Sequence, residues 1–300
     1  MKVSATSARP LHLAGVLILA VFWGLNWPAV KIALNEISPW TFRAIGLTLA
    51  GIALAMAALI RGDKLSVSRR EVAPLILAGL LTIAGFNLFL AFAQLLAPTS
   101  RAVIVTFTMP VWAVIFARIF LAEPLNWQRM VGVGLGLAGL AALASPLVAS
   151  GGLNVGLLYA LCGGVSWALG SVVTKKWPID AAPLTVASWQ LLTGAACAIG
   201  GMLLFEGIPV YHALAESTVL ALLYHVVVAL VMAYLLWFAI LPHVPLGVAS
   251  LGTLLVPAIG VGSATMLLGE RPTAMDYVGL CLITLAALSI LLPSKRARPA

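Results

Sequence analysis

Polar and aromatic side chains recur at helical spacing inside long apolar runs of this sequence. Trp23 and Asn26 are three residues apart, so both would lie on one face of a helix. Amide, hydroxyl and indole groups at such positions can hydrogen-bond to a small molecule or stack on it. The other candidates for a substrate-binding surface are Asn87, Gln94, Thr106, Trp112, Trp167, Ser171, Trp189, Gln190, Tyr234 and Thr253. The alternative for each is packing or hydrogen bonding between helices.

Two prolines lie in the middle of apolar runs, at Pro110 and Pro257. A proline inside a helix removes one backbone hydrogen bond and bends the helix. The carbonyl groups released would be those of Thr106 and Thr253, four residues earlier in each run. Bent or broken helices at matching places are typical of a central transport site. We therefore predict hinges at Pro110 and Pro257, with tolerated packing kinks as the alternative.

Few charged side chains lie close to the apolar runs. Lys31, Arg43 and Arg101 are expected near one end of their helices, where they could draw an anionic group such as a carboxylate. The alternative is that their charged ends reach the lipid headgroups. His225 is the only histidine well inside a run.

Glutamates precede the last run of each half of the chain, at Glu123 and Glu270. We expect each to cap the helix that follows it, because a carboxylate is favourable at the positive end of a helix. All nine acidic residues fall in loops or at the ends of runs. Proton-coupled transporters usually bury an acidic residue midway across the membrane. The sequence therefore favours a facilitator, with proton coupling as the alternative.

Composition restricts the class of protein. Of the 300 residues, 62% are apolar and 9% are charged, which leaves too little charge to cover a soluble surface. The net charge of +8 is spread between apolar runs, so it indicates membrane orientation rather than nucleic-acid binding. The three cysteines lie in apolar runs without a CxxC spacing, so we expect neither a disulfide framework nor a zinc site. No metal or cofactor is expected. A GxGxxG pattern at 134–139 lies inside an apolar run, so it does not indicate an enzyme.

The apolar runs are long enough to cross a bilayer as helices. Short loops between them predict antiparallel neighbours, and thus an all-α polytopic membrane protein with ten transmembrane helices. Lysine and arginine divide 13 to 4 between the two sides, which places both termini in the cytoplasm of a multi-pass inner (plasma) membrane protein. The ten predicted spans are 11–33, 39–60, 73–95, 99–121, 127–147, 153–174, 182–204, 217–239, 246–268 and 273–292.

Equivalent residues recur in the two halves of the chain. At an offset of 144, Trp23 matches Trp167 and Lys31 matches Lys175. Later the offset is 147, and Pro110 then matches Pro257. The sequence therefore predicts two five-helix repeats, 1–149 and 150–300. Because five is odd, the second repeat would enter the membrane from the opposite side, as in transporters with inverted repeats.

These features resemble the EamA family of the drug/metabolite transporter superfamily. The resemblance rests on a tryptophan in each first helix, a central proline in each fourth helix, and the sequences Leu-Ala-Glu-Pro at 121–124 and Leu-Gly-Glu-Arg-Pro at 268–272. Within the family, the chain looks closest to bacterial aromatic amino-acid exporters. The resemblance implies a ten-helix inner-membrane exporter of small metabolites that works by alternating access.

The predicted function is export of small metabolites, with amino acids, and among them aromatic ones, as the favoured substrates. The expected partners are a small-molecule substrate and the lipid bilayer, without nucleic acid, and a monomer is expected to suffice. Export of drugs, nucleosides or other metabolites with proton coupling is the first alternative. A membrane receptor or structural protein that moves no substrate is the alternative from another class.

Overall fold

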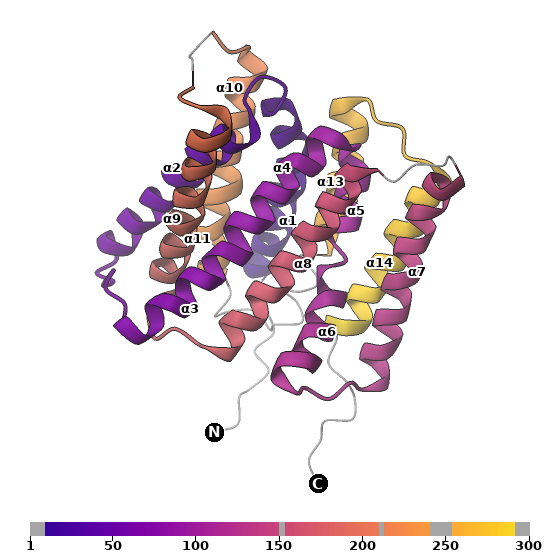
Figure 1. Ribbon diagram of the computed structural model, residues 1–300, viewed down its shortest axis with the longest axis horizontal. Coiled ribbons are helices and arrows are strands. Elements are labelled where there is room, and N and C mark those ends of the chain that lie inside the picture. The colour runs from indigo at the N-terminus through magenta and orange to yellow at the C-terminus, as the bar shows by residue number, and fades with distance from the viewer. Residues whose placement is uncertain (1–9, 150–153, 210–212, 241–253, 292–300) are drawn as a thin grey trace.

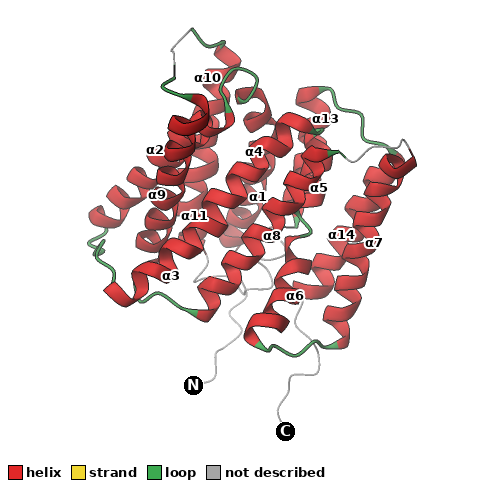
Figure 2. Ribbon diagram, in the orientation of Figure 1, coloured by secondary structure: helices red, strands yellow, loops and turns green. Residues whose placement is uncertain are grey.

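The computed structural model describes residues 10–149, 154–209, 213–240 and 254–291. These residues form a bundle of helices joined by turns, and no strand occurs among them (Figures 1 and 2). The helices are α1 (Pro10–Ala33), α2 (Pro39–Ile60), α3 (Arg69–Gly79), η1 (Leu80–Gly85), α4 (Phe86–Leu96), α5 (Thr99–Thr106), α6 (Met109–Leu121), α7 (Trp127–Ala149), α8 (Val155–Lys176), α9 (Pro183–Gly201), η2 (Met202–Glu206), α10 (Glu216–Leu223), η3 (Tyr224–Met232), α11 (Ala233–Ile240), α13 (Leu255–Leu268) and α14 (Ala274–Leu291). The elements named η are π-helical.

Within the described ranges, nine helical segments are long and apolar enough to cross a membrane. Their positions confirm nine of the ten predicted spans, and two of them, 39–60 and 99–121, have the predicted bounds. The predicted span 246–268 is represented by α13, which has 14 residues. Its predicted first part falls outside the described residues, so the tenth crossing stays a prediction.

The fourth span is divided into two helices. Helix α5 ends at Thr106, and α6 begins at Met109 with Pro110 in its first turn. A single bent helix was expected, but a two-residue turn separates the parts, in which the amide of Thr108 bonds to the carbonyl of Val105 at 3.2 Å. Proline is favourable in a first helical turn because its missing amide proton has no intrahelical partner there. Pro110 therefore starts a helix.

Both third spans contain a π-helical segment, which the sequence did not predict. Segment η1 joins α3 to α4, and η3 joins α10 to α11, giving continuous helices over 69–96 and 216–240. At the offset of 147, residues 80–85 of η1 correspond to residues 227–232 of η3. π-Helical turns are rare in proteins, and those that occur are often found at functional sites. The matching positions give both third spans the same local irregularity.

Helices of the first half pack on helices of the second half in matched pairs. Helix α2 packs on α9, and α7 packs on α14. Helix α1 contacts α13, α10, η3 and α11, while α8 contacts α5, α6, α3, η1 and α4. Thus the first helix of each half lies against the third and fourth spans of the other half. The long diagonal course of α8 beside α4 is visible in Figure 1.

Glycines allow the closest of these contacts. A Cβ atom on Gly132 of α7 would lie 2.5 Å from Ile290 of α14, and one on Gly279 of α14 would lie 2.7 Å from Leu143 of α7. Gly164 of α8 lies against the break in the fourth span, where a Cβ would lie 2.9 Å from the carbonyl oxygen of Thr106. Small residues at such positions let helix backbones approach within a membrane.

Candidate functional site

A polar cluster is buried where three helices of the two halves meet. Nη1 of Arg43 in α2 lies 3.3 Å from Nε2 of His225 in η3. On the other side of the ring, Nδ1 of His225 lies 2.8 Å from Oδ1 of Asn26 in α1. Arginine can only donate hydrogen bonds, so Nε2 accepts from Arg43 and the Nδ1 proton is donated to Asn26. The three residues, here called the Arg43 cluster, form one directed chain of hydrogen bonds.

The guanidinium group of Arg43 has no acidic partner among the described residues. Its side chain is 1% exposed, and its Nε atom has no hydrogen-bond partner within the described ranges. The guanidinium also lies 5.0 Å from the centre of the Phe42 ring, and that ring lies 4.7 Å from the ring of His225. The alternative that Arg43 extends to the lipid headgroups is therefore wrong. The charge is held inside the protein.

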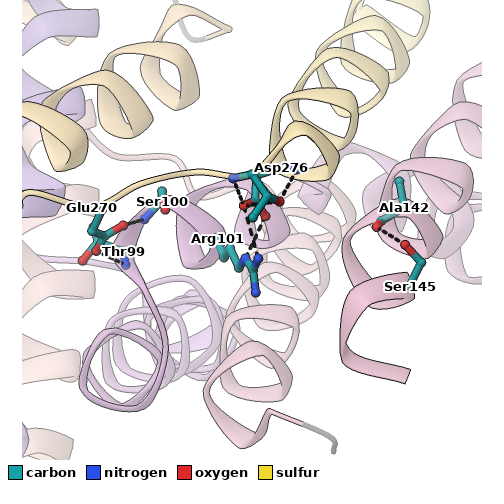
Figure 3. A network of polar contacts seen from close by, with 8 residues as sticks. Thr99, Ser100, Arg101, Ala142, Ser145, Glu270 and Asp276 are labelled. Carbon is teal, nitrogen blue, oxygen red and sulfur yellow. Dashed lines mark hydrogen bonds and ion pairs between the residues drawn. The ribbon is translucent and has the colours of Figure 1, made fainter. Parts of the chain in front are cut away.

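Lys31 and Arg101 each have a partner of their own, so the three cations do not share one site. The ammonium group of Lys31 donates to the backbone carbonyl of Gln94. Arg101 forms an ion pair with Asp276 in the first turn of α14, at 2.7 Å between Nε and Oδ1 (Figure 3). Neither Lys31 nor Arg43 forms an ion pair with a carboxylate within the described ranges, and of these two only Arg43 is fully buried.

Glu270 caps a helix of the other half. Its carboxylate accepts the backbone amides of Thr99 at 2.6 Å and Ser100 at 2.8 Å, at the start of α5 (Figure 3). The expectation that Glu270 caps α14, the helix that follows it, is wrong. Asp276 caps the start of α14 instead, because its Oδ2 atom accepts the amide of Thr273 at 2.6 Å.

Glu123, the residue that corresponds to Glu270, has different partners. It forms ion pairs with Lys175 at the end of α8 and with Arg129 in α7, the latter at 3.1 Å. The hydrogen bond from Lys175 is the main reason that the pKa of the Glu123 carboxyl lies below its usual value, and Arg129 adds to this. The amides at the start of α7 are bonded instead by Asn126, whose Oδ1 accepts the amide of Arg129.

The predicted site residues of the first half lie on several surfaces. Trp23 packs on Trp237 of α11 with 6.0 Å between ring centres. Asn87 donates to the carbonyl of Ile83, which satisfies part of the π-helical segment η1. Gln94 is buried, and its Oε1 atom has no partner in the described part of the chain.

Two further candidates of the first half line the broken fourth span. Thr106 is buried, and its hydroxyl lies 3.5 Å from the carbonyl of Ala160 in α8. Trp112 donates from its indole to the hydroxyl of Thr108 and stacks on Phe116. The first contact joins α5 to α8, and the second joins α6 to the turn at 107–108.

The candidates of the second half are also dispersed. Ser171 is hydrogen-bonded to the carbonyl of half-buried Trp167, within α8. Gln190 lies beside Gly79 of α3, and Tyr234 packs on Phe238. Pro257 is the third residue of α13. Thr253 lies outside the described residues, so its placement stays a prediction.

Trp189 lines a lateral cavity between α2, α3, η1 and α9. This cavity has a volume of about 660 Å³ and an apolar lining that includes Leu65, Leu192 and Cys197. The indole of Trp189 donates to the backbone carbonyl of Leu65 at 2.9 Å. Trp189 thus lies apart from Asn26 and the Arg43 cluster, and the structure does not bring all candidates to one surface.

Sequence reasoning singled out Asn26, Arg43 and His225 separately but did not predict that the three residues meet. Arg43 and His225 are 182 positions apart, and nothing in either local sequence indicates that they meet. One signal was available: both are ionisable residues inside apolar runs, where such residues are costly unless they face protein or water.

The long apolar helices define a multi-pass membrane protein. Residues 11–145 and 154–292 each match the model of the EamA-like transporter family, so the chain belongs to that family of membrane transporters. Similar proteins in Escherichia coli (strain K12) are the "Probable amino-acid metabolite efflux pump", 25% identical over 89% of this chain and 90% of the relative, and the "Uncharacterized inner membrane transporter YedA", 26% identical over 94% and 91%.

A protein of solved crystal structure shares the fold, with a TM-score of 0.65 and 21% identity over 94% of this chain and 96% of the other. Taken with the nine long apolar helices found among the described residues, the family match establishes a multi-pass transporter of small metabolites in the cell inner membrane.

Proposed function

We propose that the protein exports amino acids, with aromatic ones favoured, by alternating access between two inverted repeats, 1–149 and 150–300. The name of the E. coli efflux pump supports the substrate class. Trp23, Trp237 and the half-buried Asn26 between the two halves support it further, because indole faces and amides suit an aromatic amino acid.

The matched packing of the helices is the observation that carries this proposal. Helix α1 lies against the third and fourth spans of the second half, and α8 lies against the same spans of the first half. A two-fold axis in the membrane plane would produce this pattern, and it would also pair α2 with α9 and α7 with α14. Two halves with equivalent contacts can exchange conformations and thereby open the opposite side.

In this mechanism the substrate lies between the halves near α1 and α8, and the fourth spans move. The break at 107–108 lets α5 and α6 change their relative angle, with Pro110 as one hinge and Pro257 as the other. Both termini lie in the cytoplasm. Since one chain carries both halves, a monomer is sufficient.

Transport into proteoliposomes tests the proposed function. Purified full-length protein is expected to take up labelled L-phenylalanine, L-tyrosine or L-tryptophan faster than protein-free vesicles do, with and without a collapsed pH gradient. Uptake that stops when the pH gradient collapses would replace the facilitator by a proton-coupled mechanism. Binding without any uptake of the labelled amino acids would contradict transport of this substrate class.

A further inference from the structure

The buried charge of Arg43 has a feature that packing does not explain. A guanidinium removed from water is strongly unfavourable unless a counter-charge or a full set of hydrogen bonds compensates it. The imidazole of His225 is its one hydrogen-bonding contact with a described residue, and an aromatic ring is its neighbour. Glu206, the carboxylate bound at the start of the same helix, accepts from Ser38, Trp40 and Thr41 instead.

The corresponding positions of the other half contain no polar side chain. At the offsets of 144 and 147, Asn26 corresponds to Gly170, Arg43 to Ala187 and His225 to Ala78. Ala187 and Ala78 are buried, and Gly170 packs closely on Thr82 of η1. The same set of helices therefore packs in the second place without a charge. The architecture does not require an arginine at position 43.

The Arg43 cluster lies between the two halves, where the proposed function places the substrate. Arg43 and Asn26 belong to the first half, while His225 belongs to the second and is the second residue of the π-helical segment η3. Arg43 is the fifth residue of α2, about 6 Å along the helix from its start. Asn26 is seven residues before the end of α1 and only half-buried. Any relative motion of the two halves changes the contact between Arg43 and His225.

We propose that Arg43 binds the carboxylate group of the transported substrate, with His225 and Asn26 as positioning residues. This inference rests on the proposed transport of small metabolites and adds the chemical group that is recognised. In the arrangement described here, Nε2 of His225 occupies one donor of Arg43. When η3 moves away, a carboxylate can take that place, and an ionised acceptor forms the stronger hydrogen bond with a guanidinium.

The proposal makes two measurements on the purified full chain decisive. The first is thermal unfolding in detergent with L-phenylalanine, L-leucine or benzoate, each against its primary amide. We expect the carboxylates to raise the Tm of the wild-type protein and the amides to leave it unchanged. The second is the same titration on Arg43→Met, for which we expect the carboxylate effect to disappear and the apparent affinity to fall by at least about tenfold.

The Tm of the variants without added carboxylate shows whether Arg43 has a binding role or a structural role. Without carboxylates, Arg43→Met is expected to unfold at the wild-type temperature or above it, because it removes an unpaired buried charge. Arg101→Met is the matched control: it leaves Asp276 buried and unpaired, so it should lower the Tm but keep the carboxylate effect.

The results of these measurements support or overturn carboxylate binding by Arg43. The proposal is overturned if no carboxylate raises the wild-type Tm, if the amides act equally well, or if Arg43→Met lowers the Tm as much as Arg101→Met does. If carboxylates bind through Arg43 but nothing is transported into vesicles, the proposed function fails and the carboxylate site stands. If transport occurs and is unaffected by Arg43→Met, the site fails and the proposed function stands.

Discussion

Two places in the bundle have corresponding helices but different contents. In the first, Asn26, Arg43 and His225 form a buried hydrogen-bonded chain. In the second, Gly170, Ala187 and Ala78 fill the corresponding positions with small side chains or none. The backbone arrangement is therefore shared, while the chemistry is confined to one side. The two halves each match the same family model, and the polar residues that we propose for recognition occur at only one of the two corresponding places.

The corresponding residues Glu123 and Glu270 also differ in their contacts. Glu270 joins the second half to α5 of the first half through two backbone amides. Glu123 instead bonds to Lys175 of α8 and Arg129 of α7. Both connect the halves, since Lys175 also belongs to the second half, but one contact is a helix cap and the other is a pair of ions. We therefore expect the two contacts to contribute unequally to stability.

The largest expected effect comes from placing an arginine at position 187, which corresponds to Arg43 in the other half. Ala187→Arg should lower the free energy of unfolding by about 3 kcal/mol or more, because Ala187 belongs to a buried apolar cluster with Leu184 and Leu191. Denaturation of the purified variant measures this. Arg43→Met is the reciprocal change and should be tolerated. Equal losses of unfolding free energy in Ala187→Arg and Arg43→Met would contradict the conclusion that only the environment of position 43 accommodates a buried charge.

The second effect concerns the broken fourth span. Pro110→Ala restores an amide next to the break at 107–108 and favours joining α5 to α6. Uptake per folded molecule should fall by roughly tenfold, with little change in Tm, if opening depends on this break. Pro257→Ala, in the corresponding helix, serves as the comparison. Unchanged uptake in both variants would remove the hinge role of the two prolines.

The third prediction compares the stability that Glu270 and Glu123 each contribute. Glu270→Gln removes the charge that accepts two amides at the start of α5, at an expected cost of about 1–2 kcal/mol in unfolding free energy. Glu123→Gln should cost about 0.5 kcal/mol, because its partner Lys175 is 65% exposed and exposed ion pairs contribute little. Parallel chemical denaturation gives both values. A larger loss for Glu123→Gln would reverse the proposed order of the two ends.

The smallest effect is a pH dependence at the Glu123 end. The pKa of Glu123 is lowered in the folded protein, so its stabilising contribution is present above the usual value of 4.5 and is lost as the pH falls through the lower folded value. The Tm of the wild-type protein should therefore approach that of Glu123→Gln as the solution is acidified from neutral pH to below 4.5. A constant difference between the two proteins over that range would contradict this role.

Local sequence predicted the helices well, because their signals are local. Apolar runs and a proline at the first turn predicted α2 from Pro39 to Ile60, and a central proline predicted the irregular fourth span. Tertiary contacts were not predictable in this way. The cap that Glu270 provides to Thr99 joins residues 171 positions apart, and the π-helical segments have no characteristic residue pattern.

The candidate site was predicted only in part for the same reason. Asn26 was chosen from its helix face, but its bond to His225 crosses between the halves. Asn87, chosen by the same argument, bonds to the carbonyl of Ile83 in its own helix. Periodicity shows which residues share a face, and it cannot show what that face contacts.

The opposite threading of the two halves is the central claim, and accessibility labelling tests it most directly. In a variant with Cys162, Cys197 and Cys281 replaced by serine, single cysteines are placed at the exposed positions Asn35 and Asp180. A membrane-impermeant maleimide should label position 35 on intact cells, and position 180 only after the membrane is permeabilised. Labelling of both positions from the same side would contradict the inverted repeats and the transport mechanism built on them.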